Sequence, residues 1–489
     1  MRIDSQLSIL RDVAPTLIPE HLQIHREIAQ VLRSKLEISV AKLESLTKPT
    51  KEETVVSGGP EQGREVRKWK YALFKENLDV SIAELEAWQR IFDPTWYLLL
   101  KVTTENKTAS SIVDQELAKR PAVTGSALRS STQRLRHTLT SAPKVNTAIF
   151  LPENGLDVAH SSIIPFSSAK TGQRLTDSQQ PGQSYILESF SCPPNVDRKV
   201  LTRDIRDFAL KLAHADPDFF GLLRCKGVIP HCLDGSRVPE SFTFVFWMPT
   251  GMSQPVSLRS RLIDGSMHHS LSERFRLGSE LAKSVSFVHM YGFVHKNIRP
   301  ETVVLFEDGA SSLGSAFLIG FENVRTAEGI TFRIGDESWQ RDVYRHPQRQ
   351  GRAPEEDYIM QHDIYSLGVC LLEIGLWQSF VVIDDKGNSV PFSALRLSPG
   401  GDETDLPLQK GGLKEHLVAI AQNELPKRMG TKYTEIVETC LTCLDPGNVD
   451  FGDEREFEDE DGIVVGVRFI QKVRFQPFCL FYLKHISSR

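Results

Sequence analysis

The segment Phe293-Val-His-Lys-Asn-Ile-Arg-Pro-Glu-Thr-Val-Val-Leu305 determines how the rest of the chain is interpreted. Its apolar ends flank a polar centre. The final apolar residues, a polar turn from Glu307 to Gly314 and the apolar run from Ala316 to Ile319 predict a β-hairpin. Within the polar centre, Asn297 carries a neutral amide that cannot take up a proton at any working pH. Position 297 therefore offers no general base.

This segment resembles the catalytic loop of protein kinases, whose pattern is His-Arg-Asp-Leu-Lys-Pro-Glu-Asn. His295, Pro300 and Glu301 keep the pattern. The changed positions are Lys296 for the arginine, Asn297 for the catalytic aspartate, Arg299 for the lysine and Thr302 for the metal-binding asparagine. In kinases the aspartate accepts the hydrogen bond of the substrate hydroxyl and the asparagine binds a metal ion. The resemblance therefore implies the kinase fold, and the changes imply the loss of kinase chemistry.

Where kinases carry Asp-Phe-Gly, this chain has Gly320-Phe321-Glu322. The aspartate of the family binds the magnesium ion that bridges the nucleotide phosphates, and glycine has no side chain for that task. Glu322 is a carboxylate two positions further on. An atypical active kinase that uses Glu322 as a displaced metal ligand is therefore the alternative to an inactive protein.

Three further segments follow the kinase order. Residues Leu277 to His289 form an amphipathic pattern like the long helix before the catalytic loop. Pro347 is kept where Ala-Pro-Glu closes the activation segment, but Gln348 replaces the glutamate. The stretch from Gln361 to Glu373 resembles the buried helix of the kinase C-lobe, which implies that Asp363 hydrogen-bonds the backbone of the catalytic loop.

The small lobe is expected upstream of these segments. Ser184 to Phe190 and Ser241 to Pro249 are predicted strands, and Arg198 to Ala215 is a predicted amphipathic helix in the place of the regulatory helix. Glu188 then occupies the place of the lysine that pairs with phosphates, where a negative charge would repel ATP. No Gly-x-Gly-x-x-Gly loop precedes it. The phosphate loop, the lysine, the base and the metal aspartate are thus missing together, which predicts a pseudokinase.

The remaining charged side chains of the loop have structural interpretations. His295 is expected to pack against the Gly320 motif, as the matching histidine does in kinases. Lys296 and Arg299 can hold a phosphate, or they can pair with an acid of the activation segment such as Asp336 or Glu337. The pairing is preferred because it requires no ligand.

The N-terminal third has the pattern of a helical bundle. Helices are predicted from His21 to Leu46 and from about Glu61 to Phe92, and Asp93-Pro94 begins a third. The stretch from Leu85 to Tyr97 resembles the N-terminal domains of fungal HeLo-like cell-death and incompatibility proteins, which are similar to the four-helix bundle of the mixed-lineage kinase-like necroptosis effector. Met1 to Leu10 is too polar for the apolar first helix of such domains. Either membrane disruption is absent or the chain begins late.

The composition and length of the chain indicate a soluble protein with more than one domain. Hydrophobic residues make up 40% and charged residues 25% of the 489 residues, as in soluble globular proteins, and this length predicts two or more domains. The net charge of −5 gives no overall attraction to nucleic acid. The start lacks the apolar run of a signal peptide, and no stretch reaches the roughly 18 apolar residues of a membrane span. A cytoplasmic location is therefore predicted.

Seven scattered cysteines form no disulfide framework, which suits a reducing compartment. Cys440-Leu-Thr-Cys443 has the spacing of a zinc or redox pair. It falls in an apparent helix without a second pair of ligands, so two small core residues are the preferred interpretation.

We therefore expect a multi-domain chain with an all-α bundle followed by an α+β bilobal kinase-like fold. The predicted ranges are 1-105 for the HeLo-like bundle, 106-150 for a linker or brace, 151-250 for the N-lobe, and 251-489 for the C-lobe with an acidic loop near 452-462. The basic helical pattern in the linker is either a brace between domains or a contact for an acidic partner or membrane. The predicted function is an inactive signalling or scaffold protein of fungal cell-death or incompatibility signalling. Such a protein would need no cofactor or metal. We expect it to bind protein partners and to self-associate through its N-terminal helices. A membrane surface is a further candidate partner, and binding to nucleic acid is not expected.

Overall fold

The computed structural model describes residues 9–16, 149–152, 158–174, 184–193, 196–232, 238–264, 269–309, 311–326, 338–352, 356–395 and 412–448, with residues 336 and 354 and short pieces between residues 22 and 115. The chain divides into two compact units, Met1–Arg136 and His137–Arg489. The division falls inside the predicted linker 106-150.

The described part of the first unit contains helical and strand segments. Residues 9–13 are helical and lead into η1 (Ala14–Thr16). The described residues between 22 and 41 are helical too, as the helix predicted from His21 to Leu46 requires. The helix predicted from Glu61 is wrong at its start, because β2 (Arg64–Val66) pairs with β1 (Thr47–Pro49) in an antiparallel ladder. The predicted bundle, the helix after Asp93 and the linker helix otherwise lie outside the described residues.

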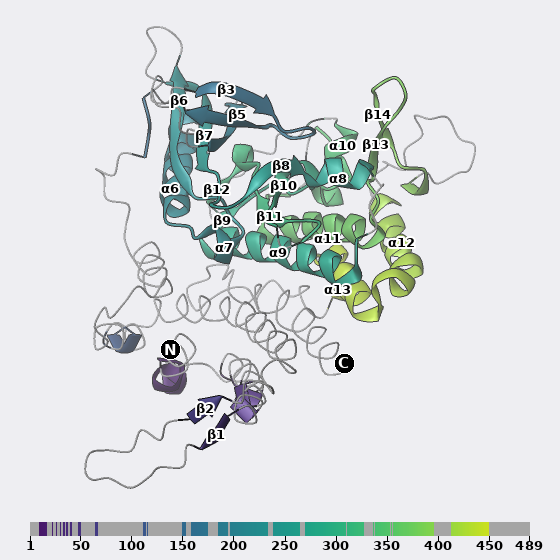
Figure 1. Cartoon of the computed structure of the whole chain (residues 1–489). Coiled ribbons are helices and arrows are strands. Elements are labelled where there is room, and N and C mark those ends of the chain that lie inside the picture. Colours follow the sequence, from purple (N-terminus) through teal and green to yellow (C-terminus); the bar gives the residue numbers. More distant parts are fainter. Residues whose placement is uncertain are drawn as a thin grey trace. The chain divides into compact units, whose positions relative to one another are not determined.

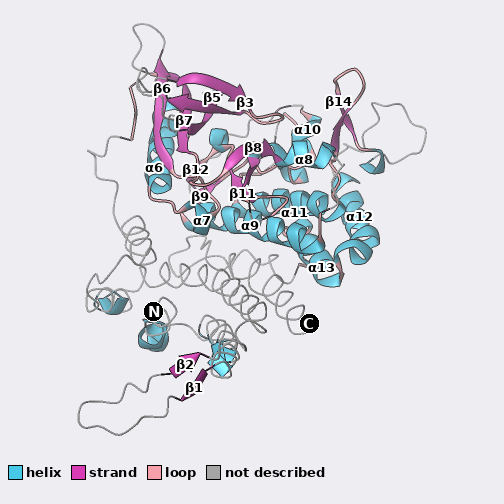
Figure 2. Cartoon of the chain, viewed as in Figure 1, coloured by secondary structure: helices cyan, strands magenta, loops and turns pink. Residues whose placement is uncertain are grey.

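The second unit contains a five-stranded antiparallel sheet (Figures 1 and 2). Its strand order is β3-β4-β5-β7-β6, with β3 at Val158–Ile163, β4 at Ala169–Arg174, β5 at Ser184–Ser191, β6 at Cys225–Cys232 and β7 at Pro239–Trp247. Alternation along β7 places Phe242, Phe244 and Phe246 on one face, and all three are fully buried. The strands predicted at 184–190 and 241–249 are therefore present.

Helix α6 (Arg198–Ala213) packs against this sheet at β6 and β7. It begins where the side chain of Asp197 accepts hydrogen bonds from the backbone N–H groups of Lys199 and Val200. Ile205, Phe208 and Leu212 form its buried stripe. The helix matches the one predicted from Arg198 to Ala215.

The remaining elements form a second sheet with helices around it (Figure 2). The sheet has the order β11-β10-β8, with β8 at Ser253–Ser257, β10 at Val303–Glu307 and β11 at Ser315–Leu318. The helices are α7 (Pro217–Phe220), α8 (Leu258–Asp264), α9 (Leu271–Met290), α10 (Trp339–Asp342), α11 (Met360–Leu376), α12 (Gly412–Met429) and α13 (Thr431–Leu441). Short pieces are β9 (Phe293–Val294) paired with β12 (Arg325–Thr326), β13 (Val381–Ile383) paired with β14 (Ser389–Pro391), and the 3-10 turns η2 (Pro300–Thr302), η3 (Phe321–Asn323), η4 (Pro347–Arg349) and η5 (Ser393–Leu395). The unit is therefore a mixture of helices and antiparallel sheets, and the predicted hairpin is β10–β11.

Helix α11 is buried along its whole length and packs closely on α13. A Cβ added at Gly368 would lie 2.7 Å from Cβ of Cys440, so the contact depends on glycine. Cys440 and Cys443 are both buried, and burial raises the pKa of the Cys443 thiol well above its usual range. Both cysteines thus occupy core positions. The predicted acidic loop at 452-462 and the apolar segment after it lie outside the described residues.

Each of the described helices is either shorter than a membrane span or carries several charged side chains. The longest, α9, has 20 residues and includes Glu273, Arg274, Glu280 and Lys283. No helix in the described part of the chain is long and apolar enough to span a bilayer.

Candidate functional site

The carboxylate of Asp363, in the first turn of α11, holds the segment that follows β9. It accepts hydrogen bonds from the backbone N–H groups of His295 (2.7 Å) and Lys296 (2.9 Å). The hydroxyl of Tyr358 donates to it at 2.7 Å, and Nε2 of His289 lies 2.9 Å away. Burial by itself would raise the pKa of this carboxyl, but the hydrogen bonds lower it to about 2. Asp363 therefore makes the backbone contact that the resemblance implies.

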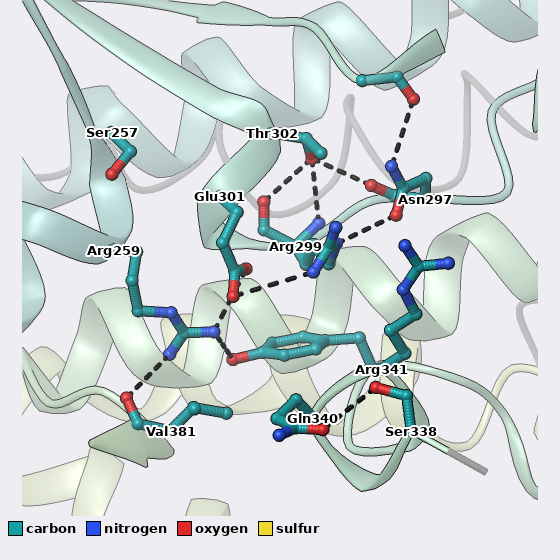
Figure 3. A network of polar contacts seen from close by, with 12 residues as sticks. Ser257, Arg259, Asn297, Arg299, Glu301, Thr302, Ser338, Gln340, Arg341 and Val381 are labelled. Carbon is teal, nitrogen blue, oxygen red and sulfur yellow. Dashed lines mark hydrogen bonds and ion pairs between the residues drawn. The ribbon is translucent and has the colours of Figure 1, made fainter. Parts of the chain in front are cut away.

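The polar side chains of the loop bond to one another (Figure 3). Nδ2 of Asn297 donates to the carbonyl oxygen of Gly320 at 3.3 Å, and Oδ1 accepts from Nε of Arg299 at 2.9 Å. The hydroxyl of Thr302 lies 2.9 Å from the carbonyl oxygen of Asn297. Asn297 is only 9% exposed. Its amide therefore joins the loop to the Gly320 segment through Nδ2 and holds the side chain of Arg299, within the loop, through Oδ1.

Gly320 leaves no room for a side chain. Its φ of 93° lies in the left-handed region, which residues with a Cβ rarely adopt. A Cβ at this position would lie 2.7 Å from Cβ of Thr302, and Cγ2 of Thr302 would be closer still. Gly320, which stands where the kinase pattern has the metal-binding aspartate, is thus packed against Thr302, which stands where that pattern has the metal-binding asparagine.

Glu188 lies beside this pair as a buried acid. Its side chain is on the inner face of β5, it is 1% exposed, and its Oε2 atom has no hydrogen-bond partner among the described residues. Burial raises its pKa to about 8, although the backbone N–H groups of Gly320 and Phe321 oppose the rise. At neutral pH the carboxyl is therefore mostly protonated, and the position carries neither a cation nor a full negative charge.

Glu188→Gln is expected to change how stability depends on pH. Because the pKa of Glu188 is raised from 4.5 to about 8 on folding, the protonated acid stabilises the fold below pH 4.5, and this contribution is lost as pH rises to about 8. The loss is at most about 1.4 kcal/mol per pH unit. Glutamine does not titrate, so urea unfolding should show a flatter decline for Glu188→Gln than for the wild type. Glu435→Gln, at an exposed site on α13, is the control, and equal slopes for all three proteins would contradict the burial of a neutral acid.

Phe321 fills the space between the loop and the five-stranded sheet. It is fully buried, and its ring centroid lies 4.8 Å from that of Phe208 on α6 and 5.0 Å from that of His295. The rings of Phe244 and Phe246 on β7 lie 6.2 Å away. Aromatic side chains from α6, β7 and η3 thus meet next to Glu188.

His295 has both ring nitrogens in use. Nε2 lies 2.9 Å from the carbonyl oxygen of Ile319, and Nδ1 accepts from the backbone N–H of Asn297 at 3.2 Å. These partners place the single proton of a neutral ring on Nε2. Burial lowers the pKa of His295 to about 4, although Asp363 opposes the shift. The ring therefore packs against Phe321, as expected, and has no lone pair available for a substrate proton.

Glu322 is engaged by a cation of the chain itself. One carboxylate oxygen lies 3.4 Å from the guanidinium of Arg341 and 3.3 Å from Nδ2 of Asn323. Within the described ranges, no group of three or more His, Cys, Asp or Glu side chains could hold a metal ion. The geometry thus gives Glu322 a partner that competes with a metal.

The expected pairing of Lys296 and Arg299 with Asp336 is wrong. Asp336 binds the guanidinium of Arg345 at 2.9 Å, and Arg299 instead contacts Asn297 and, at 3.8 Å, Glu301. Glu337 lies outside the described residues. The ammonium of Lys296 lies 5.5 Å from the ring centre of Tyr358. Burial first, and then the nearby charges of Arg325 and Arg349, lower its pKa to about 7.

Pro347 begins the 3-10 turn η4, where its missing N–H costs no hydrogen bond. Oε1 of Gln348 lies 3.3 Å from Nε2 of His362 at the start of α11. The glutamate expected from the family pattern is therefore replaced by an amide that bonds to a buried histidine.

A buried network of charged side chains lies next to the loop, and no pattern in the sequence indicates it (Figure 3). Arg259 on α8 is 1% exposed, and its guanidinium lies 3.2 Å from Glu373 and 3.2 Å from Glu301. It also donates to the hydroxyl of Tyr344 at 2.5 Å and to the carbonyl oxygen of Val381 at 3.3 Å. Arg259 and Glu373 are 114 positions apart, and no spacing or motif in the sequence connects them.

The structure therefore brings Glu188, Asn297, Thr302 and Gly320 together into one site. Asp363 lies behind it, holding the backbone, while Pro347 and Asp336 belong to other clusters. No model of a known protein family matches this chain.

Proposed function

We propose that the chain from about residue 151 is a bilobal protein kinase-like domain that does not catalyse phosphoryl transfer. The five-stranded sheet with α6 between its third and fourth strands in chain order, β5 and β6, supports this fold. So do the order of α9, the loop and the β10–β11 hairpin, and the buried α11 with Asp363 bonded to the loop backbone.

One observation supports the proposed absence of catalytic activity. At the site where the resemblance would place a lysine, a base and two metal ligands, the structure has a buried neutral acid, an internally bonded amide, and a glycine packed against threonine. Kinases lower their barrier by positioning the nucleotide and by stabilising charge with metal ions and cations. None of the four residues at this site carries a positive charge, and position 320 has no room for a carboxylate beside Thr302.

If the site does not bind nucleotide, ATP should not raise the thermal stability of the protein. A ligand at 100 times its Kd stabilises the folded state by about 2.7 kcal/mol, which raises Tm by several degrees. Thermal unfolding of the full chain with ATP, with and without magnesium or manganese, should show no such rise. An active protein kinase in the same buffers is the control. A strong metal-dependent rise would instead favour an atypical kinase that uses Glu322.

We further propose that the domain acts as a signalling or scaffold element coupled to an N-terminal HeLo-like helical domain, in fungal cell-death or incompatibility signalling. The loose resemblance of Leu85 to Tyr97 and the division of the chain into two compact units support this arrangement. Protein partners, self-association through the N-terminal helices, and a cytoplasmic location with access to a membrane surface belong to the same proposal.

The effector part can be tested on the full chain. Light scattering reports self-association, and dye release from anionic and zwitterionic vesicles reports membrane disruption. Concentration-dependent assembly, with or without dye release, supports the proposal. A monomer that leaves both kinds of vesicle intact counts against an effector role and leaves the nucleotide result unaffected.

A further inference from the structure

The turn between β3 and β4 is tied to a distant part of the same unit. Residues 164–168 form this turn, closed by hydrogen bonds from the N–H of Ile164 to the carbonyl of Ala169 (3.0 Å) and from the N–H of Ser167 to the carbonyl of Ile164 (3.1 Å). Ile164 is buried, whereas Ile163 and Phe166 are 67% and 43% exposed. The turn thus presents one side to the protein interior and the other to solvent.

Two serine hydroxyls hold this turn by a single carbonyl group. The carbonyl oxygen of Pro165 accepts from Oγ of Ser257 at 2.6 Å and from Oγ of Ser260 at 3.2 Å. Ser257 ends β8 and is fully buried, and Ser260 is half-buried in the first turn of α8. We call the contact between Pro165, Ser257 and Ser260 the hairpin latch.

Strand registers show what the latch connects. Ala169, at the start of β4, pairs with Glu188 on β5, so the turn lies next to the buried acid. Ser257 pairs with Val304 on β10, two positions after Thr302. The hairpin latch therefore spans from the Glu188 side of the candidate site to its Thr302 side, and Figure 1 shows the β3–β4 hairpin directed towards α8.

The latch holds the hairpin through few interactions. Strand β3 is an edge strand, the bond from Ser260 is exposed to water, and Phe166 has a φ of 56°, which is unfavourable for a residue with a side chain. Segments with few buried contacts and solvent-exposed hydrogen bonds open first in native proteins. The hydroxyl of Ser260 donates to the carbonyl oxygen of Pro165. If a group that cannot donate a hydrogen bond replaced this hydroxyl, the carbonyl oxygen would lose that hydrogen bond, which destabilises the closed arrangement.

We propose that the hairpin latch is a releasable strap: its two serine hydrogen bonds hold the turn between β3 and β4 against α8, and their loss frees the turn and the edge strand β3, while β4 stays paired with β5 and the rest of the unit stays folded. Such an element has a closed and an open arrangement, which is what a switch requires. The inference concerns the mobility of the hairpin and does not depend on whether the domain binds nucleotide.

Hydrogen exchange on the full chain tests the latch. In Ser257→Ala/Ser260→Ala, amides of residues 161–168 should exchange about tenfold faster than in the wild type, because hydrogen bonds that hold the closed state are gone. Ser260→Thr, which keeps the hydroxyl at a half-buried position, and Ser253→Ala, at an exposed serine of β8, should behave like the wild type.

Ser260→Asp separates loss of the latch from damage to the start of α8. Oγ of Ser257 also accepts from the N–H of Ser260 at 3.2 Å, so alanine at 257 weakens the start of α8 as well. Ser260→Asp leaves Ser257 intact and places a carboxylate near the carbonyl oxygen of Pro165, so it should open the hairpin more than Ser260→Ala. Unchanged exchange in both Ser257→Ala/Ser260→Ala and Ser260→Asp overturns the proposal. Acceleration of the α11 amides equal to that of the hairpin overturns it too, because the whole unit would then be opening.

Discussion

Gly320→Ala is expected to destabilise the second unit by about 3 kcal/mol in urea unfolding. Two separate penalties add. A Cβ at a φ of 93° is strained by about 1–2 kcal/mol, and crowding in a packed interior costs about another 1–3 kcal/mol. The crowding arises because the new methyl group would meet the side chain of Thr302, which is 2% exposed and held by hydrogen bonds to the loop backbone.

Two other glycines separate these penalties. Gly292 has a φ of 77° and open space where a methyl group would lie, so Gly292→Ala measures the backbone strain alone. Gly447 has neither a positive φ nor a neighbour within 4 Å, and Gly447→Ala should be nearly neutral. Thr302→Ser removes the methyl group that is crowded and keeps the hydroxyl, so the double variant Gly320→Ala/Thr302→Ser should recover part of the loss.

The result also bears on the proposed function. If Gly320→Ala costs no more than Gly292→Ala, the site has room for a side chain, and filled space does not account for the proposed loss of metal binding. If the additional cost appears, an aspartate at 320 meets the same obstruction. Restoring the kinase pattern at this one position should then lower stability without creating metal-dependent ATP binding.

The sequence predicted those parts of the fold that depend on local pattern. The spacing of apolar residues was sufficient for α6 and α9, and a nearly continuous apolar run was sufficient for β7, because each buries a face that follows from its own period. The contact of Asp363 with the loop backbone was implied by the family pattern. The strand β2 was not predicted, because its pairing with β1 is a non-local contact that overrides local helix propensity.

The interior of the site could not be predicted in the same way. The sequence places a negative charge at Glu188, but only burial shows that the acid is largely neutral. The spacing of Thr302 and Gly320 says nothing about their contact, which arises because Ile319 donates its N–H to the carbonyl of Thr302 across the β10–β11 hairpin. Arg299 and Asp336 carry opposite charges, yet Asp336 is taken by Arg345, nine positions away on the same segment. Which of several possible charge partners is nearest is a tertiary property.

Arg259→Met is expected to cost about 3–5 kcal/mol at about pH 8, the largest effect of any change considered, because at that pH it leaves a buried carboxylate without its partner. Glu373 is fully buried, and its Oε1 atom accepts from Arg259, from the hydroxyl of Tyr344 at 2.9 Å and from the N–H of Phe380 at 2.6 Å. Methionine preserves most of the volume of the side chain, so the loss reports the charge and its hydrogen bonds rather than a cavity. Lys432→Met, in an exposed pair with Glu435, is the matched control and should cost about 1 kcal/mol or less.

The penalty should depend on pH with a definite sign. Burial raises the pKa of Glu373 from 4.5 to about 7 even though Arg259 opposes the rise, so removal of Arg259 must raise it further. A raised carboxyl pKa stabilises the fold at low pH and loses that contribution as pH rises, so Arg259→Met should be less harmful at about pH 5.5 than at about pH 8. Adding Glu373→Gln removes the titrating group, and the double variant should regain stability at the higher pH. A penalty that is the same at both pH values, or no larger than that of Lys432→Met, would mean that water reaches Glu373 and that the network does not join α8 to α11 as a buried ion pair.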